Sequence, residues 1–73
     1  MPKLVPISYR KLKKILVQLG FKELRSKGSH HFFVHSNGRC TTLPFRKNDI
    51  SDGLLSQILK DVGLSVEEYD RLR

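Results

Sequence analysis

Two stretches of the chain repeat apolar residues at helical spacing, and each is followed by a glycine. In residues 8–20, SYRKLKKILVQLG, the apolar stripe consists of Leu12, Ile15, Leu16 and Leu19. In residues 54–63, LLSQILKDVG, the stripe consists of Leu54, Leu55, Ile58, Leu59 and Val62. This periodicity predicts two amphipathic helices, which Gly20 and Gly63 can end in left-handed caps.

The middle of the chain alternates in the manner of strands. Residues 29–36, SHHFFVHS, and residues 39–45, RCTTLPF, are separated by Asn37 and Gly38. Asn-Gly is the strongest short-range signal for a two-residue type I′ hairpin, because both turn positions need positive φ. A shorter first strand is predicted over residues 21–26, FKELRS.

A two-residue turn fixes which side chains of the hairpin share a face, because successive strand residues point to opposite sides. Pairing outward from this turn sets Ser36 opposite Arg39, Val34 opposite Thr41, Phe32 opposite Leu43 and His30 opposite Phe45. The other face carries His31, Phe33, His35, Cys40, Thr42 and Pro44. Since the first face is more apolar, we expect it to pack on the helices, with His30 at the end of its row. Pro44 fits a strand end or an outer strand, because it cannot donate to a ladder.

The resulting order is α-β-β-β-α with a short acidic helix after it. That last helix, residues 66–72, is predicted because Ser65 and Glu68 have the spacing of a capping box. The fold class is therefore α+β, with a three-stranded antiparallel sheet and helices on one face. The 73 residues contain no repeat or linker, so we expect a single domain over residues 1–73.

The net charge of +7 is unevenly distributed along the chain. Residues 1–47 carry eleven Lys/Arg against one acid, whereas residues 48–73 carry three against six acids. A basic surface of this size indicates a partner with phosphates, such as nucleic acid. Two other interpretations remain open, namely a solvated helix face and a surface that receives an acidic protein partner.

Several classes of protein are disfavoured by the composition. Cys40 is the only cysteine and cannot form an intrachain disulfide. No apolar run reaches the ~18 residues that span a bilayer, and the start of the chain, with Lys3 and a broken apolar pattern, does not resemble a signal peptide. We expect a cytoplasmic protein with no membrane partner.

Three histidines lie in or beside the second predicted strand, and strand geometry argues against a metal site. His31 and His35 share a face but stand four residues apart, roughly 13 Å at a rise of ~3.3 Å per residue, too far for one ion. His35 and Cys40 are the remaining pair, opposite one another in the predicted hairpin. Two ligands make a weak site, so no metal is expected.

His30 has the position best suited to acid–base chemistry. It follows Lys27, Gly28 and Ser29, a turn that can present backbone N–H groups and a hydroxyl to an anion. An unperturbed imidazole exchanges a proton near neutral pH, provided that it reaches the proton transferred. The competing interpretation is an ordinary histidine at the edge of the core.

Motifs along almost the whole chain resemble one family of toxins, HicA or YcfA-like. The motifs that carry the resemblance are "LGF" at 19–21, "GSHHFF" at 28–33, "NGR" at 37–39, "LPF" at 43–45 and "LLSQILKDVGLSVEEY" at 54–69. The resemblance implies a double-stranded-RNA-binding-domain-like fold, and an mRNA interferase that a HicB-type antitoxin holds inactive. It places the catalytic role on the histidine after Gly-Ser, here His30, with His31 as the alternative.

On this basis we expect a metal-independent endoribonuclease that cleaves single-stranded mRNA and needs no cofactor. The residues expected to bind RNA are Lys11, Lys14, Arg25, Lys27, Gly28 and Ser29. Phe33, on the predicted outer face, is available to stack a base. The alternative function is a non-catalytic RNA-binding domain. Duplex binding is disfavoured because Ser51, Asp52 and Gly53 stand where this architecture usually has lysines, at the start of its last main helix.

Overall fold

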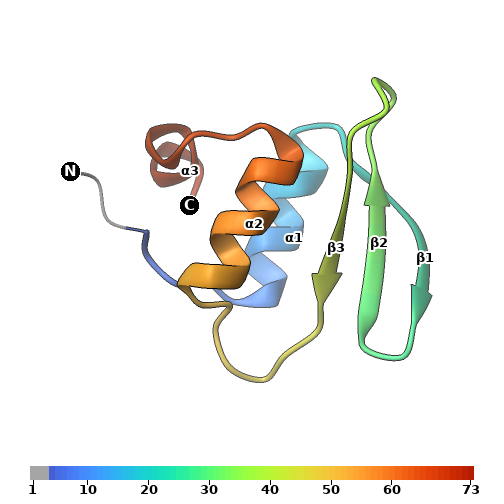
Figure 1. Cartoon of the computed structure of the whole chain (residues 1–73), viewed down its shortest axis with the longest axis horizontal. Coiled ribbons are helices and arrows are strands. Elements are labelled where there is room, and N and C mark those ends of the chain that lie inside the picture. Colours follow the sequence, from blue (N-terminus) through green and yellow to red (C-terminus); the bar gives the residue numbers. More distant parts are fainter. Residues whose placement is uncertain (1–3) are drawn as a thin grey trace.

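Two helices pack against one face of a three-stranded antiparallel sheet, and a third helix lies on their far side from the sheet (Figure 1). The computed structural model describes residues 4–73, so Lys3 lies outside the described residues. The elements in chain order are α1 (Tyr9–Gln18), β1 (Lys22–Lys27), β2 (His30–Val34), β3 (Cys40–Pro44), α2 (Asp52–Val62) and α3 (Val66–Leu72). The predicted fold class, α+β with helices on one face of the sheet, is confirmed.

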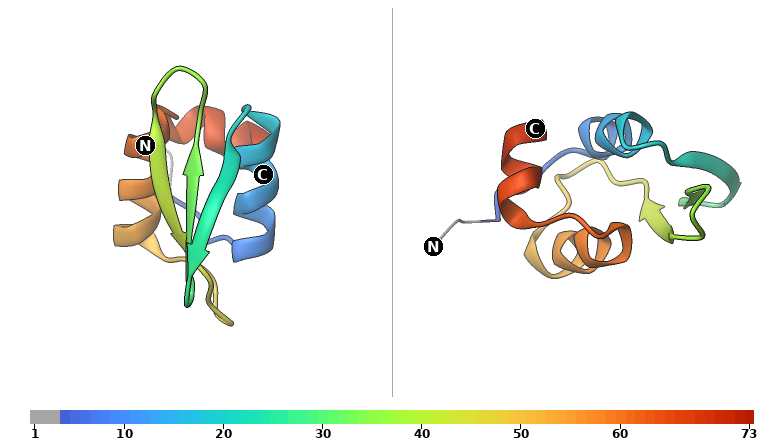
Figure 2. Two further views of the ribbon diagram at one scale, coloured as in Figure 1. Left: turned by 90° about the vertical axis from the view of Figure 1, so that its right-hand side faces the viewer. Right: turned by 90° about the horizontal axis from the view of Figure 1, so that it is seen from above.

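The strand order is β1-β2-β3, so β2 is central and the other two strands are edges. Helices α1 and α2 lie on the same side of the sheet, and α3 lies on the side of these helices away from it (Figure 2). The core between these layers contains Leu12, Leu16, Phe33, Leu43, Leu55 and Ile58, together with Phe21 and Tyr69. Strand β1 extends beyond the helices and all six of its residues are exposed.

Local sequence signals cap the ends of the helices. The Ser8 side chain accepts from the Lys11 N–H at the start of α1, and the capping box of Ser65 and Glu68 begins α3. Gly63 caps α2 at φ 73°, in the left-handed region. Helix α2 begins two residues earlier than the predicted stripe, at Asp52.

The predicted register of the hairpin is wrong by one residue. The observed Cα partners are His30–Pro44, His31–Leu43, Phe32–Thr42, Phe33–Thr41 and Val34–Cys40. The loop has three residues instead of two: His35 N–H donates to Arg39 O at 2.8 Å, and Gly38 N–H donates to His35 O at 2.9 Å. Among the described residues only glycines have positive φ, so Asn37 does not adopt the type I′ conformation. Gly38, at φ 96°, is the left-handed third residue of a three-residue hairpin.

This shift exchanges the two faces of β2 but leaves those of β3 as predicted. Phe33 is 1% exposed and packs in the core, whereas Phe32 lies on the outer face. The suggestion that Phe33 stacks a base is therefore wrong. His30 is exposed on the outer face, so its expected place at the end of the core row is also wrong. Phe45, expected in the core, is 55% exposed.

Candidate functional site

The turn between β1 and β2 places His30 at one end of the sheet. Gly28 adopts φ 59°, which allows the chain to reverse between Lys27 and His30, the last Cα partners of the strand pair. The carbonyl of Ser29 accepts a 2.6 Å hydrogen bond from the N–H of Phe45. The turn is therefore tied to the segment that follows β3, and both lie at the lower end of the sheet in Figure 1.

His30 lies on the outer face of the sheet with basic neighbours. The pairing of β1 and β2 puts Lys27 beside His30 and Arg25 beside Phe32, the next outward position. The Arg25 guanidinium lies over the Phe32 ring, 5.2 Å from its centroid. In residues 4–73, polar side-chain contacts engage His31 and His35 but not His30. The exposed His30 ring is thus open to an external group.

His31 points the opposite way, toward α1. Its ring centroid lies 5.3 Å from that of Tyr9, and its Nδ1 lies 3.4 Å from Glu23 Oε1. This distance is within ion-pair range. The contact does not meet the geometry of a hydrogen bond, and His31 Nδ1 has no hydrogen-bond partner among the described residues. The same carboxylate oxygen lies 3.6 Å from Lys13 Nζ. Adjacent residues in a strand therefore offer two different environments, one open and one half-buried.

A bulge in β1 places Glu23 and Arg25 on opposite faces of the sheet. Glu23 pairs with Phe33 and Arg25 pairs with Phe32, so the register shifts by one residue at Leu24. Without this extra residue, Glu23 and Arg25 would point to the same face. The bulge sends the carboxylate toward His31 and the guanidinium to the His30 side.

Tyr9 links the half-buried histidine to the segment after β3. Its ring meets Phe45 edge to face, with centroids 5.2 Å apart. Burial raises the pKa of the Tyr9 hydroxyl above its usual range, and the charge of Glu23 raises it further. Tyr9 therefore remains a neutral phenol at physiological pH.

His35 has a structural role. Its Nδ1 accepts from the Asn37 N–H at 3.1 Å, so Nε2 carries the proton and donates to Leu19 O at 3.1 Å. The expected pairing of His35 with Cys40 is wrong, because His35 faces Arg39 and Cys40 pairs with Val34. Residues 4–73 contain no cluster of three or more potential metal ligands.

The basic residues of α1 fall into two groups. Lys11 and Lys14 line a hollow with Gln18, Leu72 and Arg73, on the side of α1 that faces α3. Of the residues expected to bind RNA, only Arg25, Lys27, Gly28 and Ser29 lie near His30. A second hollow, of about 550 Å³, is lined by Ser8, Tyr9, Arg10, Lys13, Phe45, Arg46 and Lys47. Arg10 and Lys13 belong to the basic outer surface of α1, and their spacing of three residues places them on one helix face.

Most of the chain matches one known protein family. A family model described as HicA toxin of bacterial toxin-antitoxin matches residues 9–64, which is more than half of the chain. The chain belongs to the HicA toxin family. No curated protein matches it. For a HicA toxin, membership of a toxin–antitoxin family implies an antitoxin partner.

The match to the HicA family spans α1, the whole sheet and α2, and so includes all three histidines. Helix α3 follows the matched region. Within residues 4–73, no helix has the length and apolar character needed to cross a membrane.

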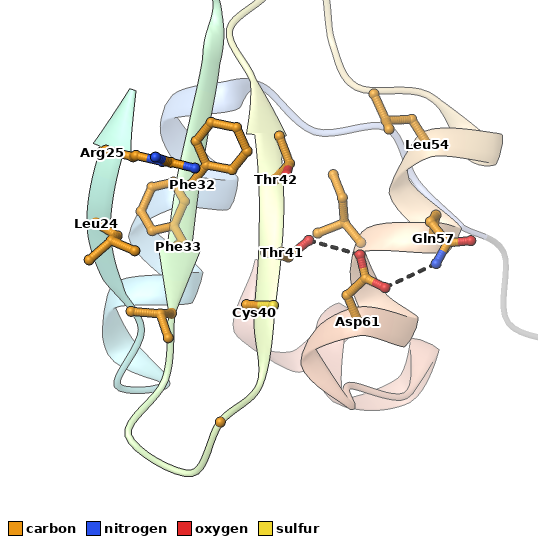
Figure 3. Close-up of a pocket in the computed structure, with 13 residues that line it drawn as sticks. Leu24, Arg25, Phe32, Phe33, Cys40, Thr41, Thr42, Leu54, Gln57 and Asp61 are labelled. Carbon is orange, nitrogen blue, oxygen red and sulfur yellow. Dashed lines mark hydrogen bonds between the residues drawn. The ribbon is translucent and has the colours of Figure 1, made fainter. Parts of the chain in front are cut away.

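A third and larger hollow of this HicA toxin, of about 720 Å³, lies along the outer face of the sheet and its edge with α2 (Figure 3). Phe32, Val34 and Leu24 contribute apolar surface to it. Across its floor, Thr41 Oγ1 donates to Asp61 Oδ2 at 3.1 Å, and Gln57 Nε2 donates to Asp61 Oδ1 at 3.0 Å. None of the three histidines lines it, and its one carboxylate is held by two donors, so it is the weaker candidate for proton transfer.

Proposed function

We propose that this HicA-family toxin is a metal-independent endoribonuclease that cleaves single-stranded mRNA in the cytoplasm, with His30 as the group that transfers a proton. The observation that carries the proposal is the position of His30: its ring is exposed, beside Lys27, directly after the Gly28-Ser29 turn. The basic surface supplies the attraction for phosphates. Charge on Lys27 and Arg25 holds the RNA backbone on the outer face of the sheet.

The proposed chemistry is attack of a ribose 2′-hydroxyl on the adjacent phosphorus. His30 takes the 2′-hydroxyl proton, the new bond closes a 2′,3′-cyclic phosphate, and the 5′-oxygen of the next nucleotide leaves with a proton from Lys27 or water. Lys27 and the Ser29 hydroxyl donate hydrogen bonds to the non-bridging oxygens, which gain negative charge as the phosphorus is attacked. With a single histidine serving the first transfer, turnover is expected to be slow.

Single-stranded RNA is the proposed substrate because α2 lacks the usual duplex contacts. Its first turn contains Asp52 and Gly53 after Ser51, and no lysine. A carboxylate at this helix end repels the phosphates that a duplex would bring there. Unpaired nucleotides also have the flexible backbone that in-line attack by the 2′-hydroxyl requires.

The test is cleavage of a labelled single-stranded mRNA in excess chelator by wild type, His30→Ala and His31→Ala. Circular dichroism checks that each variant is folded. We expect wild type and His31→Ala to cut and His30→Ala to be inactive, with fragments that end in a 2′,3′-cyclic phosphate and begin with a 5′-hydroxyl. Loss of cleavage only in His31→Ala would assign the proton transfer to His31, on the face of the sheet that also carries Glu23.

Two outcomes would contradict the proposal itself. Fragments with a 5′-phosphate and a 3′-hydroxyl would exclude attack by the 2′-hydroxyl. If all folded proteins bind RNA and none cuts it, the protein is a non-catalytic RNA-binding domain.

A further inference from the structure

The hollow lined by Tyr9, Arg10, Lys13, Phe45, Arg46 and Lys47 combines an exposed aromatic ring with four cations. We propose that this aromatic-basic hollow is a nucleotide-binding subsite, in which an unpaired base stacks on Phe45 and the flanking phosphates contact the cations. The inference rests on the proposed function, since it places one nucleotide of the same RNA strand that His30 cleaves.

Phe45 is exposed, and the structure anchors its backbone and one edge of its ring. It is 55% exposed, although the two residues before it, Leu43 and Pro44, are buried. Its backbone is held by the hydrogen bond to Ser29, and its ring is held by the edge-to-face contact with Tyr9. These two contacts restrict the ring, so it loses less entropy than a freely rotating side chain would when a base stacks on it. Base–aromatic stacking is worth about 1–3 kcal/mol per base and tolerates any base, because every base has a π-face.

The charges around Phe45 fit a phosphate backbone. The lining includes Arg10, Lys13, Arg46 and Lys47 and no carboxylate. Lys13 lies 3.6 Å from Glu23, and it is the one of the four with an ion-pair partner in the described residues. The three remaining cations have their full charge available for an anion.

The location of the hollow connects it to the proposed cleavage site. The hydrogen bond between Phe45 N and Ser29 O joins the hollow to the residue before His30. The start of α1, the β1–β2 turn and the segment after β3 all lie at the same end of the molecule (Figure 1). His30 points to the outer face, whereas the hollow lies on the α1 side, so the bound strand must bend around this end. A flexible single strand can do so, but a duplex cannot, and its paired bases are not free to stack on Phe45.

Binding of a non-cleavable RNA tests the subsite without requiring catalysis. The probe is a short fluorescent oligonucleotide in which every 2′-hydroxyl is methylated, and the readout is fluorescence anisotropy. We expect Phe45→Leu to weaken binding about tenfold, as expected for the loss of one stacked base, while Phe45→Tyr keeps near wild-type affinity. Circular dichroism of both variants confirms the fold, which an exposed position should preserve.

The charges are tested with a matched pair of double variants. Arg46→Gln with Lys47→Gln removes two cations from the hollow, and Lys60→Gln with Arg71→Gln removes two exposed cations from α2 and α3. We expect the first pair to lower the slope of log affinity against log salt by about 1.4, at ~0.7 per phosphate contact on a single strand. The second pair should change the slope much less. Equal slopes for the two double variants would show that only net charge matters, and would overturn the subsite.

Failure of the inference and failure of the proposed ribonuclease give different results. If wild type cleaves RNA and Phe45→Leu binds the probe as tightly as wild type, the subsite is wrong and the ribonuclease stands. If wild type does not cleave RNA but its binding of the probe depends on Phe45, the subsite stands and the ribonuclease is wrong. The competing occupant is an acidic protein segment. An oligoglutamate of equal charge that binds as tightly as the probe, with the same loss in Phe45→Leu, would assign the hollow to such a partner and overturn the inference.

Discussion

His35 connects the hairpin to the end of α1, because its Nε2 donates to the carbonyl oxygen of Leu19 at 3.1 Å. That carbonyl lies at the C-terminal end of the helix, where the backbone acceptors lack intrahelical donors. The ring also packs edge to face on Phe21, with centroids 5.1 Å apart. The third histidine of the cluster is therefore part of the fold, unlike the exposed His30.

Replacement of His35 should affect stability and leave chemistry intact. We expect His35→Ala to lower the free energy of unfolding by about 1–2 kcal/mol, because Leu19 O and the Asn37 N–H lose their partners. RNA cleavage per folded molecule should match wild type. Urea denaturation measures the stability and the RNA cleavage assay measures the activity. His30→Ala is the comparison, because it should keep its stability and lose its activity. A stable His35→Ala protein without activity would contradict this assignment.

Arg39 makes a second link between the hairpin and a helix end. Its guanidinium donates to Val62 O at the end of α2, and it lies over Phe21, 5.5 Å from the ring centroid. We expect Arg39→Ala to cost about 1.5–3 kcal/mol, as for hydrogen bonds that involve a charged group. Arg71→Ala, an exposed arginine in α3, is the control and should stay within about 0.5 kcal/mol of wild type in chemical denaturation. Equal stabilities of the two variants would show that the Arg39 contact contributes nothing.

Alanine should have opposite effects at Gly38, in the hairpin loop, and at Gly53, in α2. Gly38 has φ 96° and open space around it, so Gly38→Ala should destabilise through backbone strain alone, by about 1 kcal/mol. Gly53 lies in α2 with an ordinary φ and no close neighbour, so Gly53→Ala should stabilise by up to about 1 kcal/mol. Thermal unfolding of both variants measures the two shifts. A neutral Gly38→Ala would be inconsistent with a left-handed residue at this position.

Alkaline pH should destabilise the protein as its two tyrosines ionise. Burial raises the pKa of Tyr69, Arg73 lowers it, and Asp70 and Asp49 raise it, with a net increase; the pKa of Tyr9 is raised mainly by burial. A folded-state pKa above the unfolded value of about 10 means that the stabilisation is complete below pH ~10 and is lost as pH rises through the folded pKa. We expect tyrosinate absorbance at 295 nm to appear at a higher pH than in free tyrosine, and the urea midpoint measured by helical circular dichroism to fall over the same pH range.

Tyr69→Phe separates the contribution of this residue from that of Tyr9. The Tyr69 hydroxyl donates to Val5 O, so the variant should be less stable at neutral pH and less sensitive to pH above 10. Denaturation midpoints at pH 8 and pH 10.5 provide the comparison. An unchanged alkaline loss of stability in Tyr69→Phe would attribute that loss to other groups.

The candidate site illustrates how far pattern alone carries the argument. The Gly28-Ser29-His30 motif identified the turn but put His30 on the wrong face of the sheet, whereas the alternation of β3 predicted which of its residues face inward. The same reasoning exchanged Phe33 with Phe32 and missed the aromatic-basic hollow. Phe45 was assigned to the core because it ends an apolar row, but the helices do not cover that position. How far the helix layer extends over the sheet depends on how the elements pack, so the local pattern could not show that Phe45 is uncovered.

The sequence by itself determined the helices, their caps, the order of the elements and the presence of a hairpin at Asn37-Gly38. These features depend on contacts between residues a few positions apart, so a local pattern is enough to specify them. Only the tertiary structure decided between a two-residue and a three-residue loop, because Asn-Gly is compatible with both. The choice depends on contacts between distant segments, with Phe33 in the core, His35 at Leu19 and Arg39 at Val62. That single residue of register decides which face of the sheet presents His30.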